Sequence, residues 1–397
     1  PCIFYPSIGL SGIISEMVKL PEFISYLKLR TSYTEVGSPI TQTGITPGTV
    51  TDPMSGGVIN PISTYPYPDF KPERTKSYEV GINARFLNGR ISFDGTFYQS
   101  NTYNQTFLSV MSPATGYSGF YVQAGNVRNR GVEMTLGYND TFGKVNYSTH
   151  LTYTANQNKI VEMVHDYRNP IDNSLVNITE LTLKEAGDVY LREGYSMSDV
   201  FTTGILQRGR DGKLVEEGNG YQVDRSQRIR LGSADPDFTM GWRHDINYKN
   251  ISLGLMITGR FGGIVTSQTQ AFMDAFGVSK VSAEARDNGG VMLDGHRYDA
   301  ERYYNTVGGQ GLMSYYTYDA TNVRLQELSL TYSLPKKWLG DVFNNATISF
   351  VGRNLFMFYR KAPFDPDMNG STGTYNRSDF FMAPSLRNLG FSIKFSL

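Results

Sequence analysis

The sequence predicts an all-β fold: an antiparallel, up-and-down transmembrane β-barrel, of which this chain supplies about half, roughly eleven strands of a wall of about 22. Three observations lead to this prediction. Apolar and polar residues alternate with a period of two in many segments of the 397-residue chain. Short and long connections alternate strictly between these segments. No run of about 18 apolar residues predicts a transmembrane helix, whereas a barrel strand needs only about 9–11 residues.

The segment from Arg387 to Leu397 shows the alternation most completely. Its apolar residues are separated by single small or polar residues, and they are Leu389, Phe391, Ile393, Phe395 and Leu397. A strand with this pattern has one apolar face and one small or polar face. We expect the apolar face to contact lipid and this strand to close the barrel.

A short turn sets the register of a first hairpin. Residues 78–86 and 91–97 flank Leu87–Arg90, whose Asn-Gly pair favours the positive φ angles of a tight hairpin turn. A slip of one residue would move every apolar side chain to the opposite face, so the pairing is well specified. The expected pairs are Phe86 with Ile91, Ala84 with Phe93 and Val80 with Phe97 on the apolar face, and Arg85 with Ser92 and Asn83 with Asp94 on the other.

A second hairpin is predicted from Phe238 to Ile257 around the turn Lys249-Asn250. Tyr248 should pair with Ile251 and Trp242 with Ile257. His244 falls on the apolar face, where we expect it near a membrane interface or packed beside Trp242.

Seven further strands complete the count: Pro6–Ser15, Tyr26–Gly37, Gly131–Tyr138, Val145–Asn156, Leu325–Leu334, Thr347–Leu355 and Arg387–Leu397. The long connections are rich in turn-forming residues and tyrosine, and they are Ser38–Arg74, Asn101–Arg130, Gln157–Pro236, Gly262–Asn322 and Met357–Leu386. An up-and-down sheet places all short turns at one end and all long loops at the other. Outer-membrane barrels have this asymmetry, with short periplasmic turns and long extracellular loops.

Composition narrows the functional classes. Lys plus Arg equals Asp plus Glu at 37 each, so neither a basic surface for nucleic acid nor an acidic tail is present. Cys2 is the only cysteine, which excludes an intrachain disulfide and a thiolate zinc cluster. The histidines are scattered, and no nucleophile or phosphate-binding motif occurs, so no enzyme is expected. Because the chain begins at Pro1 without a signal peptide, we expect it to be a fragment of a longer protein.

Several motifs resemble one family in their sequence and in their order along the chain. They are Lys71-Pro72-Glu73-Arg74-Thr75-Lys76-Ser77-Tyr78-Glu79-Val80-Gly81, Asn126-Val127-Arg128-Asn129-Arg130-Gly131-Val132-Glu133, Tyr26-Leu27-Lys28-Leu29-Arg30, Asn322-Val323-Arg324-Leu325, Leu334-Pro335, and Gly352-Arg353-Asn354-Leu355-Phe356 followed by Asp365-Pro366-Asp367. Together they cover nearly the whole chain. They resemble SusC/RagA-type TonB-linked outer-membrane proteins, which are TonB-dependent receptors.

The resemblance implies an importer of oligosaccharides or peptides in the outer membrane of a Gram-negative bacterium. It implies a wide barrel filled by an N-terminal plug domain and energised through a segment that binds TonB. It also implies a SusD-like surface lipoprotein that caps the extracellular loops. The plug and the TonB-binding segment are absent from these 397 residues, so we expect the whole chain, residues 1–397, to be the C-terminal portion of the barrel.

One loop resembles half of a calcium site. Asp365, Asp367 and Asn369 lie in D-P-D-M-N-G, which matches the first half of a D-x-D-x-N-G loop whose oxygen atoms suit Ca²⁺. The twelfth position is Asn376 rather than a bidentate Glu, and Pro366 is unusual in such a loop. A polar extracellular turn is the alternative interpretation. No other cofactor is expected.

Aromatic residues gather in the predicted loops and are candidates for contact with cargo or a partner. They are Tyr65, Tyr67, Phe70, Tyr117, Phe120, Tyr121, Tyr303, Tyr304, Tyr315 and Tyr316. Aromatic faces stack on sugar rings or peptide side chains, and phenol hydroxyls add directional hydrogen bonds. The alternative is that these residues pack the loops against each other or against a partner.

A soluble all-β binding or adhesive domain is the alternative to the membrane barrel. The two differ in where the apolar strand face points. In a barrel it faces lipid, and the polar face lines a wet lumen. In a soluble sandwich it must be buried against a second sheet. The polar face is expected to carry Lys28, Arg30, Glu79, Asn83, Arg85, Asp94, Glu133 and Arg243.

Overall fold

The computed structural model describes residues 4–38, 64–65, 71–110, 114, 116–117, 119–168, 175–183, 189–339, 343–367, 378–383 and 385–396. Within them, the largest sheet has fourteen strands, and eleven of these form a continuous antiparallel path in the order in which they occur along the chain, with β3, β10 and β11 attached beside it. In order, the eleven strands are β1 (Ser7–Ile13), β2 (Ile24–Ser38), β4 (Glu73–Phe86), β5 (Ile91–Val110), β6 (Gly119–Phe142), β7 (Val145–Glu162), β16 (Phe238–Tyr248), β17 (Ile251–Phe261), β22 (Asn322–Ser333), β23 (Asn345–Arg360) and β25 (Asn388–Ser396).

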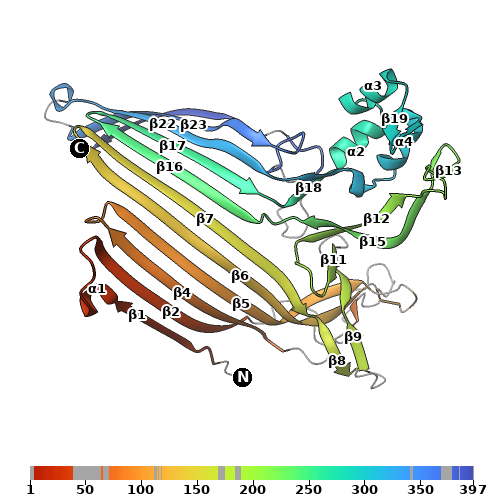
Figure 1. The fold of residues 1–397 in the computed structure, drawn as a ribbon, viewed down its shortest axis with the longest axis horizontal. Coiled ribbons are helices and arrows are strands. Elements are labelled where there is room, and N and C mark those ends of the chain that lie inside the picture. The colour runs from red at the N-terminus through yellow and green to blue at the C-terminus, as the bar shows by residue number, and fades with distance from the viewer. Residues whose placement is uncertain are drawn as a thin grey trace, which may run out of the picture.

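Figure 1 shows these strands side by side, with the short turns gathered at one end of the sheet and the long connections at the other. The chain terminus marked C lies at the short-turn end. The predicted antiparallel up-and-down architecture and its count of about eleven strands are therefore confirmed.

Both predicted hairpin registers are confirmed. Phe86 pairs with Ile91, Ala84 with Phe93 and Val80 with Phe97. In the second hairpin Tyr248 pairs with Ile251 and Trp242 with Ile257. The Asn88-Gly89 turn has the expected positive φ angles, 58° and 83°. His244 packs beside Trp242 with ring centroids 4.4 Å apart, as one of the two expectations for it stated.

The long connections are more ordered than the sequence predicted. Asn101–Arg130 was expected to be a loop, but β5 continues to Val110 and β6 begins at Gly119. Polar residues occupy both faces of these extensions, for example in the run Asn101 to Thr106, so the apolar alternation that marks the rest of the strands is missing. The strands therefore project beyond the region where one face is apolar.

The connections Gln157–Pro236 and Gly262–Asn322 contain short strands and helices. The short strands, with those of the other connections, are β3 (Thr64–Tyr65), β8 (Val164–Arg168), β9 (Leu175–Ile178), β10 (Glu180–Leu183), β11 (Val189–Arg192), β12 (Asp199–Leu206), β13 (Glu216–Glu217), β14 (Gly220–Tyr221), β15 (Val223–Ser233), β18 (Ile264–Ser267), β19 (Val291–Leu293), β20 (His296–Tyr298), β21 (Thr317–Asp319) and β24 (Ser378–Asp379). We call the described residues of these two connections, 163–168, 175–183, 189–237 and 262–321, the loop assembly.

The α-helices are α1 (Ile14–Met17), α2 (Gln268–Ala275), α3 (Lys280–Asp287) and α4 (Ala300–Val307), with 3-10 turns at Met313–Tyr315 and Lys336–Trp338. No helix in the described ranges is long and apolar enough to cross a membrane. Helix α4 shows why these elements form. The Asp299 side chain accepts a hydrogen bond from the Arg302 amide, which caps the helix, and Ala300, Tyr303, Tyr304 and Val307 are spaced along its buried face.

The buried cores lie in the loop assembly rather than behind the sheet. One cluster joins the ends of β6 and β7 to β8, β10 and β11, and it includes Val127, Ile160, Leu181 and Leu191. A second surrounds α4 and includes Val307 and Leu312, which are almost wholly inaccessible. The loop assembly therefore folds around cores of its own, as a small soluble domain does.

The apolar face of the sheet is exposed along nearly its whole width. On the last strand, Phe391 is 80% exposed and Ile393 is 51% exposed, and no described element covers them. Other exposed members of this face are Tyr78, Val80, Phe97, Met134, Leu136, Trp242, Leu253, Leu330, Ile348, Phe350, Leu389 and Phe395. A soluble sandwich would have to bury this face, so the arrangement fits a wall that faces lipid.

Replacing Ile393 with Arg in the full-length protein should cost about 2–4 kcal/mol of folding free energy if the residue lies near the bilayer midplane, because a cation would then face hydrocarbon. Denaturation of the protein reconstituted in lipid bilayers measures this cost. Ser392→Arg is the matched control, since the neighbouring side chain points to the opposite, polar face. Equal losses for the two variants would contradict a lipid-facing position for Ile393.

Candidate functional site

The polar face of the sheet forms an inner wall on which the expected charged residues lie together. Strand registers put Lys28 opposite Asn83 and Asn83 opposite Asp94, so all three share one face. In the next row Arg30 lies opposite Gly81, Gly81 opposite Thr96 and Thr96 opposite Glu133. Because side chains alternate, Glu79, Arg85 and Arg243 lie on this same face. This wall carries both signs of charge, in contrast to the apolar face behind it.

Arg30 crosses one strand to reach a partner on the next. Its guanidinium donates to both carboxylate oxygens of Asp94, at 2.8 and 3.0 Å, and to Thr96 Oγ1 at 2.5 Å. Asn83 donates to the same carboxylate at 2.8 Å. The side chain passes over Gly81, where a Cβ atom would collide with the guanidinium. Gly81 is in β4, between β2 and β5, and its lack of a side chain permits this bidentate ion pair. The contact therefore connects β2 to β5 across β4.

Nearer the long-loop end, the charged rows give way to amides. The Tyr98 hydroxyl reaches over Gly131 and donates to Asn156 Oδ1 at 3.2 Å. Asn101 donates to Asn126 at 2.7 Å. Asn158 and Asn156 both donate to Asn129 Oδ1, at 3.0 and 3.4 Å. Asn129, Asn156 and Asn158 form an amide row that presents neutral donors and acceptors along the mouth of the inner wall, whereas Asn101 and Asn126 lie on the opposite face of the sheet.

Three of the candidate tyrosines are buried in the core of the loop assembly, and Tyr315 packs against that core. Tyr303, Tyr304 and Tyr316 are each 8% exposed or less and belong to the cluster around α4. Burial raises the pKa of Tyr303 and Tyr316 far above the ordinary value, and the Asp274 carboxylate adds to this effect. These phenols stay neutral at physiological pH. Their position fits the alternative stated from the sequence, in which they pack the loops against each other.

Tyrosine hydroxyls also connect the two large connections. Tyr315 accepts a hydrogen bond from the Leu206 amide at 3.2 Å, and Tyr298 accepts one from the Leu214 amide at 3.1 Å. Burial, together with Asp274, raises the pKa of Tyr318 to about 12. These contacts attach residues 206–214 to residues 298–315, which makes one assembly from segments far apart in the chain.

The remaining aromatic candidates lie elsewhere. Tyr121 is buried at the start of β6, and Tyr117, four residues earlier in the chain, is half-buried. The backbones of Tyr65 and Phe120 pair as neighbours in β3 and β6. Tyr67 and Phe70 lie outside the described residues. Contact of these aromatic residues with cargo or a partner stays a prediction.

The two described residues of the calcium-like loop surround an arginine. Arg324 Nη2 lies 2.7 Å from Asp365 Oδ1 and 2.5 Å from Asp367 Oδ2, and Asp365 also accepts a hydrogen bond from Ser385. Burial acts to raise the pKa of Asp365, but the hydrogen bonds from Arg324 and Ser385 outweigh it and hold this pKa below its usual value. The guanidinium thus neutralises the carboxylates that would bind Ca²⁺. Asn369 lies outside the described residues, and calcium binding stays a prediction.

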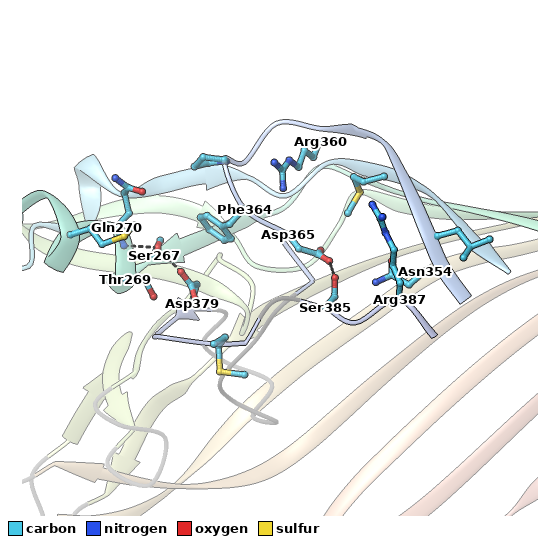
Figure 2. A pocket seen from close by; sticks show the side chains of 15 residues that line it. Ser267, Thr269, Gln270, Asn354, Arg360, Phe364, Asp365, Asp379, Ser385 and Arg387 are labelled. Atoms are coloured by element: carbon cyan, nitrogen blue, oxygen red, sulfur yellow. Dashed lines mark hydrogen bonds between the residues drawn. The ribbon is translucent and has the colours of Figure 1, made fainter. Parts of the chain in front are cut away.

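A cavity of 420 Å³ lies between α2, the long-loop end of β23 and the segment before β25, as Figure 2 shows. Asp379 accepts a hydrogen bond from Ser267 at 2.7 Å, and Asp365 is held by Ser385 and Arg324. These carboxylates therefore hold the loops in place. Apolar side chains complete the lining, among them Met273, Met357, Met382 and Phe364.

Comparison with known proteins identifies the family to which this chain belongs. Residues 4–258 match the family described as TonB dependent receptor-like, beta-barrel. The chain belongs to this family of TonB-dependent receptors. The family comprises receptors and transporters of the Gram-negative outer membrane, and the exposed apolar face accordingly faces outer-membrane lipid. The long connections then lie outside the cell and the short turns in the periplasm.

Two curated relatives come from Formosa agariphila. TonB-dependent receptor P3 is 24% identical over 99% of this chain and 42% of its own length, and TonB-dependent receptor P26 is 25% identical over 92% of this chain and 39% of its own length. Among solved structures, the RagAB peptide transporter is similar over 98% of this chain and 43% of that chain, with a TM-score of 0.72 and 16% sequence identity. This chain therefore spans about two-fifths of the length of these proteins, and the structural likeness shows the fold.

Removing Arg324 should destabilise the protein strongly, because Asp365 would remain buried without its partner. Arg324→Met in the full-length protein is expected to cost about 3–5 kcal/mol. The ion pair of Asp365 contributes fully to the free energy of unfolding above the pKa of an aspartate in the unfolded chain, about 3.9. This contribution is lost as the pH falls through the lower pKa that Asp365 has in the folded protein. Chemical denaturation at neutral and acidic pH measures both effects.

Arg360→Met is the matched control for Arg324→Met. Arg360 lies on the adjacent strand and makes no ion pair within the described residues, so its loss should cost about 0.5 kcal/mol or less. A similar loss of stability in both variants, or a loss that does not shrink at acidic pH, would contradict the role assigned to the Arg324–Asp365 pair.

Proposed function

We propose that this chain is the C-terminal half of the barrel of an active outer-membrane importer whose cargo is oligosaccharide or peptide. The observation that carries the proposal is the two-faced sheet. Its outer face is an exposed apolar band, and its inner face carries ion pairs such as Arg30–Asp94 and, toward the mouth, neutral amides such as Asn129 and Asn158. Membership of the TonB-dependent receptor family supports energised transport, and the similarity to a peptide transporter supports organic cargo.

The open edges of the sheet support the assignment to half a barrel. Among the described strands, β1 pairs only with β2, and β25 pairs only with β23. Each unpaired backbone N–H or C=O group in hydrocarbon costs several kcal/mol, so open sheets do not persist in membranes. We therefore expect further strands to pair with both edges and close a barrel of about 22 strands. A plug domain and a TonB-binding segment would belong to that complete protein.

An exposed apolar surface on the loop assembly supports a partner protein. Phe276 and Val278, in the turn between α2 and α3, and Val281, in α3, are 54–76% exposed. Phe272 packs against Phe380 and Phe381, with ring centroids 6.2 and 5.8 Å apart, and these rings are also exposed. We call these six residues the extracellular apolar patch. Contiguous patches of this kind mark interaction sites, and a SusD-like lipoprotein lid is the partner that the family resemblance implies.

Disruption of the full-length gene in its host should abolish uptake of one class of oligosaccharide or peptide that is too large for ordinary diffusion pores. Uptake of the labelled cargo should also stop when TonB is removed, because the energy comes from the inner membrane. Growth on free monosaccharides and amino acids is the control and should not change. Uptake that persists without TonB, or no nutrient defect on any oligosaccharide or peptide, would contradict the proposal.

Replacing both Phe276 and Val281 with Ser should weaken co-purification of the lid lipoprotein roughly tenfold or more, because two large apolar contacts are lost. The barrel should still assemble, which a heat-modifiability gel checks. Phe142→Ser is the control, since Phe142 is also 56% exposed but lies at the short-turn end. Unchanged co-purification of the lid with the double variant would contradict the assignment of this patch.

A further inference from the structure

The outer face of the sheet changes from apolar to basic toward the long-loop end. Strand registers place one side chain from each of β4, β5, β6 and β7 in a row, and the last apolar row is Val80, Phe97, Val132 and Ala155. Two residues farther along each strand, the second row on this face is Tyr78, Gln99, Arg130 and Gln157. The third row is Lys76, Asn101, Arg128 and Lys159. The change takes about 13 Å along the strands, because each row advances by two residues. We call Lys76, Arg128, Arg130 and Lys159 the basic rim.

The second row marks the level of a membrane interface. Tyr78 packs against Tyr33 of β2, with ring centroids 4.9 Å apart. Outer-membrane barrels carry aromatic residues where the apolar band meets the lipid headgroups. These tyrosines lie on the side of the long loops, so this interface belongs to the outer leaflet. The third row, with Lys76, Arg128 and Lys159, is then at the depth of the headgroups.

Two cations of the basic rim lie directly opposite each other. Arg128 is the cross-strand neighbour of Lys159, and like charges in this position destabilise a sheet. Within the described residues, neither side chain makes a hydrogen bond or an ion pair. Arg130 uses one nitrogen, which donates to Gln157 at 2.9 Å. An anion from outside these segments would offset the repulsion between the cations.

The carboxylates of this face do not neutralise the basic rim. Glu35 lies opposite Lys76, but it bonds to Arg74 at 2.9 Å. Glu162 lies opposite Asn126, one row farther from the apolar band. These rows therefore hold five cations, which are Arg74 and the four of the basic rim, and two carboxylates. The excess of positive charge favours an anionic ligand over a cationic or neutral one.

A shallow groove of 190 Å³ crosses the boundary between the apolar band and the basic rim. Its lining includes apolar, cationic and amide side chains and one carboxylate, and these residues are Phe97, Val132, Ala155, Arg130, Gln157 and Asp237. A lipid has the same succession of properties along its length, with acyl chains below a polar headgroup. The basic rim is therefore continuous with the lipid-facing surface of the wall.

Phosphate groups suit this arrangement of cations. An arginine guanidinium can donate two parallel hydrogen bonds to one phosphate, and a lysine ammonium adds a compact positive charge. A phosphate between Arg128 and Lys159 would replace their repulsion by two attractive contacts. The position of the rim selects the source of the phosphate. In the outer leaflet of a Gram-negative outer membrane, the lipid is a glycolipid whose acylated sugar headgroup carries phosphates.

We propose that the basic rim binds the phosphorylated headgroup of the outer-leaflet glycolipid, with Arg128 and Lys159 as the phosphate ligands and Arg130 beside them at the groove. The acyl chains of the bound lipid lie along the apolar band below. This inference does not depend on which cargo the protein imports.

The test uses the purified full-length protein in a non-ionic detergent with EDTA, which prevents bridging by divalent metal ions. The probe is bisphosphorylated lipid A, and native mass spectrometry measures its affinity. Wild type should bind this lipid roughly tenfold or more tightly than lipid A from which the phosphates have been removed. The double variant Arg128→Gln with Lys159→Gln should bind the phosphorylated lipid roughly tenfold or more weakly than wild type, because two cations near a lipid surface are lost.

A matched control removes the same two residue types at the opposite end of the sheet. Arg90 and Lys249 are exposed in the turns before β5 and β17, at the short-turn end. Arg90→Gln with Lys249→Gln should bind the phosphorylated lipid as wild type does. A heat-modifiability gel checks that both double variants assemble, which is expected because Arg128 and Lys159 have no partner among the described residues.

Several outcomes would overturn the proposal. They are an unchanged affinity in the Arg128 and Lys159 variant, an equal loss in the control, and a wild type that does not distinguish the two forms of lipid A or binds neither. Displacement of the lipid by inorganic phosphate at equal concentration would assign the rim to free phosphate. Binding of polyglutamate without binding of lipid A would assign it to an acidic protein segment, and the lipid assignment would fall.

Discussion

The rest of the structure depends on one constraint: within a lipid bilayer, every backbone N–H and C=O group must find a partner in the protein. The eleven strands meet it by pairing each with the next along the chain, from β1 to β25. Since side chains alternate along a strand, a single sheet then has one face for lipid and one for water. The apolar band and the polar inner wall are two consequences of the same hydrogen-bonded ladder.

Glycines in the inner wall are as important for its contacts as the polar side chains are. Gly81 and Gly131 leave room for Arg30 and Tyr98 to cross a strand and bond to the next one. These crossings connect three strands through side chains, in addition to the backbone ladder. The Arg30–Asp94 pair deep in the wall is held in this way, whereas the amides of Asn129, Asn156 and Asn158 lie near the mouth.

Outside the membrane the chain is surrounded by water, so apolar side chains are buried in cores instead of facing lipid. The strands β5, β6 and β7 continue past the apolar band and become the base of the loop assembly, whose cores bury Ile160, Leu191, Val307 and Leu312. The Arg324–Asp365 pair attaches the segment after β23 to the start of β22. Rigid loops of this kind can hold a cavity open and present an apolar patch, which free loops could not do.

The sequence alone determined the sheet, because a period-two pattern, an Asn-Gly turn and a lipid-facing row such as Leu389 to Phe395 are local signals that leave one register open. Its motifs, taken together, also indicated the family. The extent of β5 and β6 could not be predicted, because polar residues occupy both faces of a strand in water. Helix α4 was missed although Asp299 and the spacing of Ala300, Tyr303, Tyr304 and Val307 signal it. Only the tertiary structure decided which polar groups have partners. Arg324 meets Asp365 and Asp367 across 41 and 43 residues, because contacts between distant segments are set by how the loops fold together and not by any local pattern.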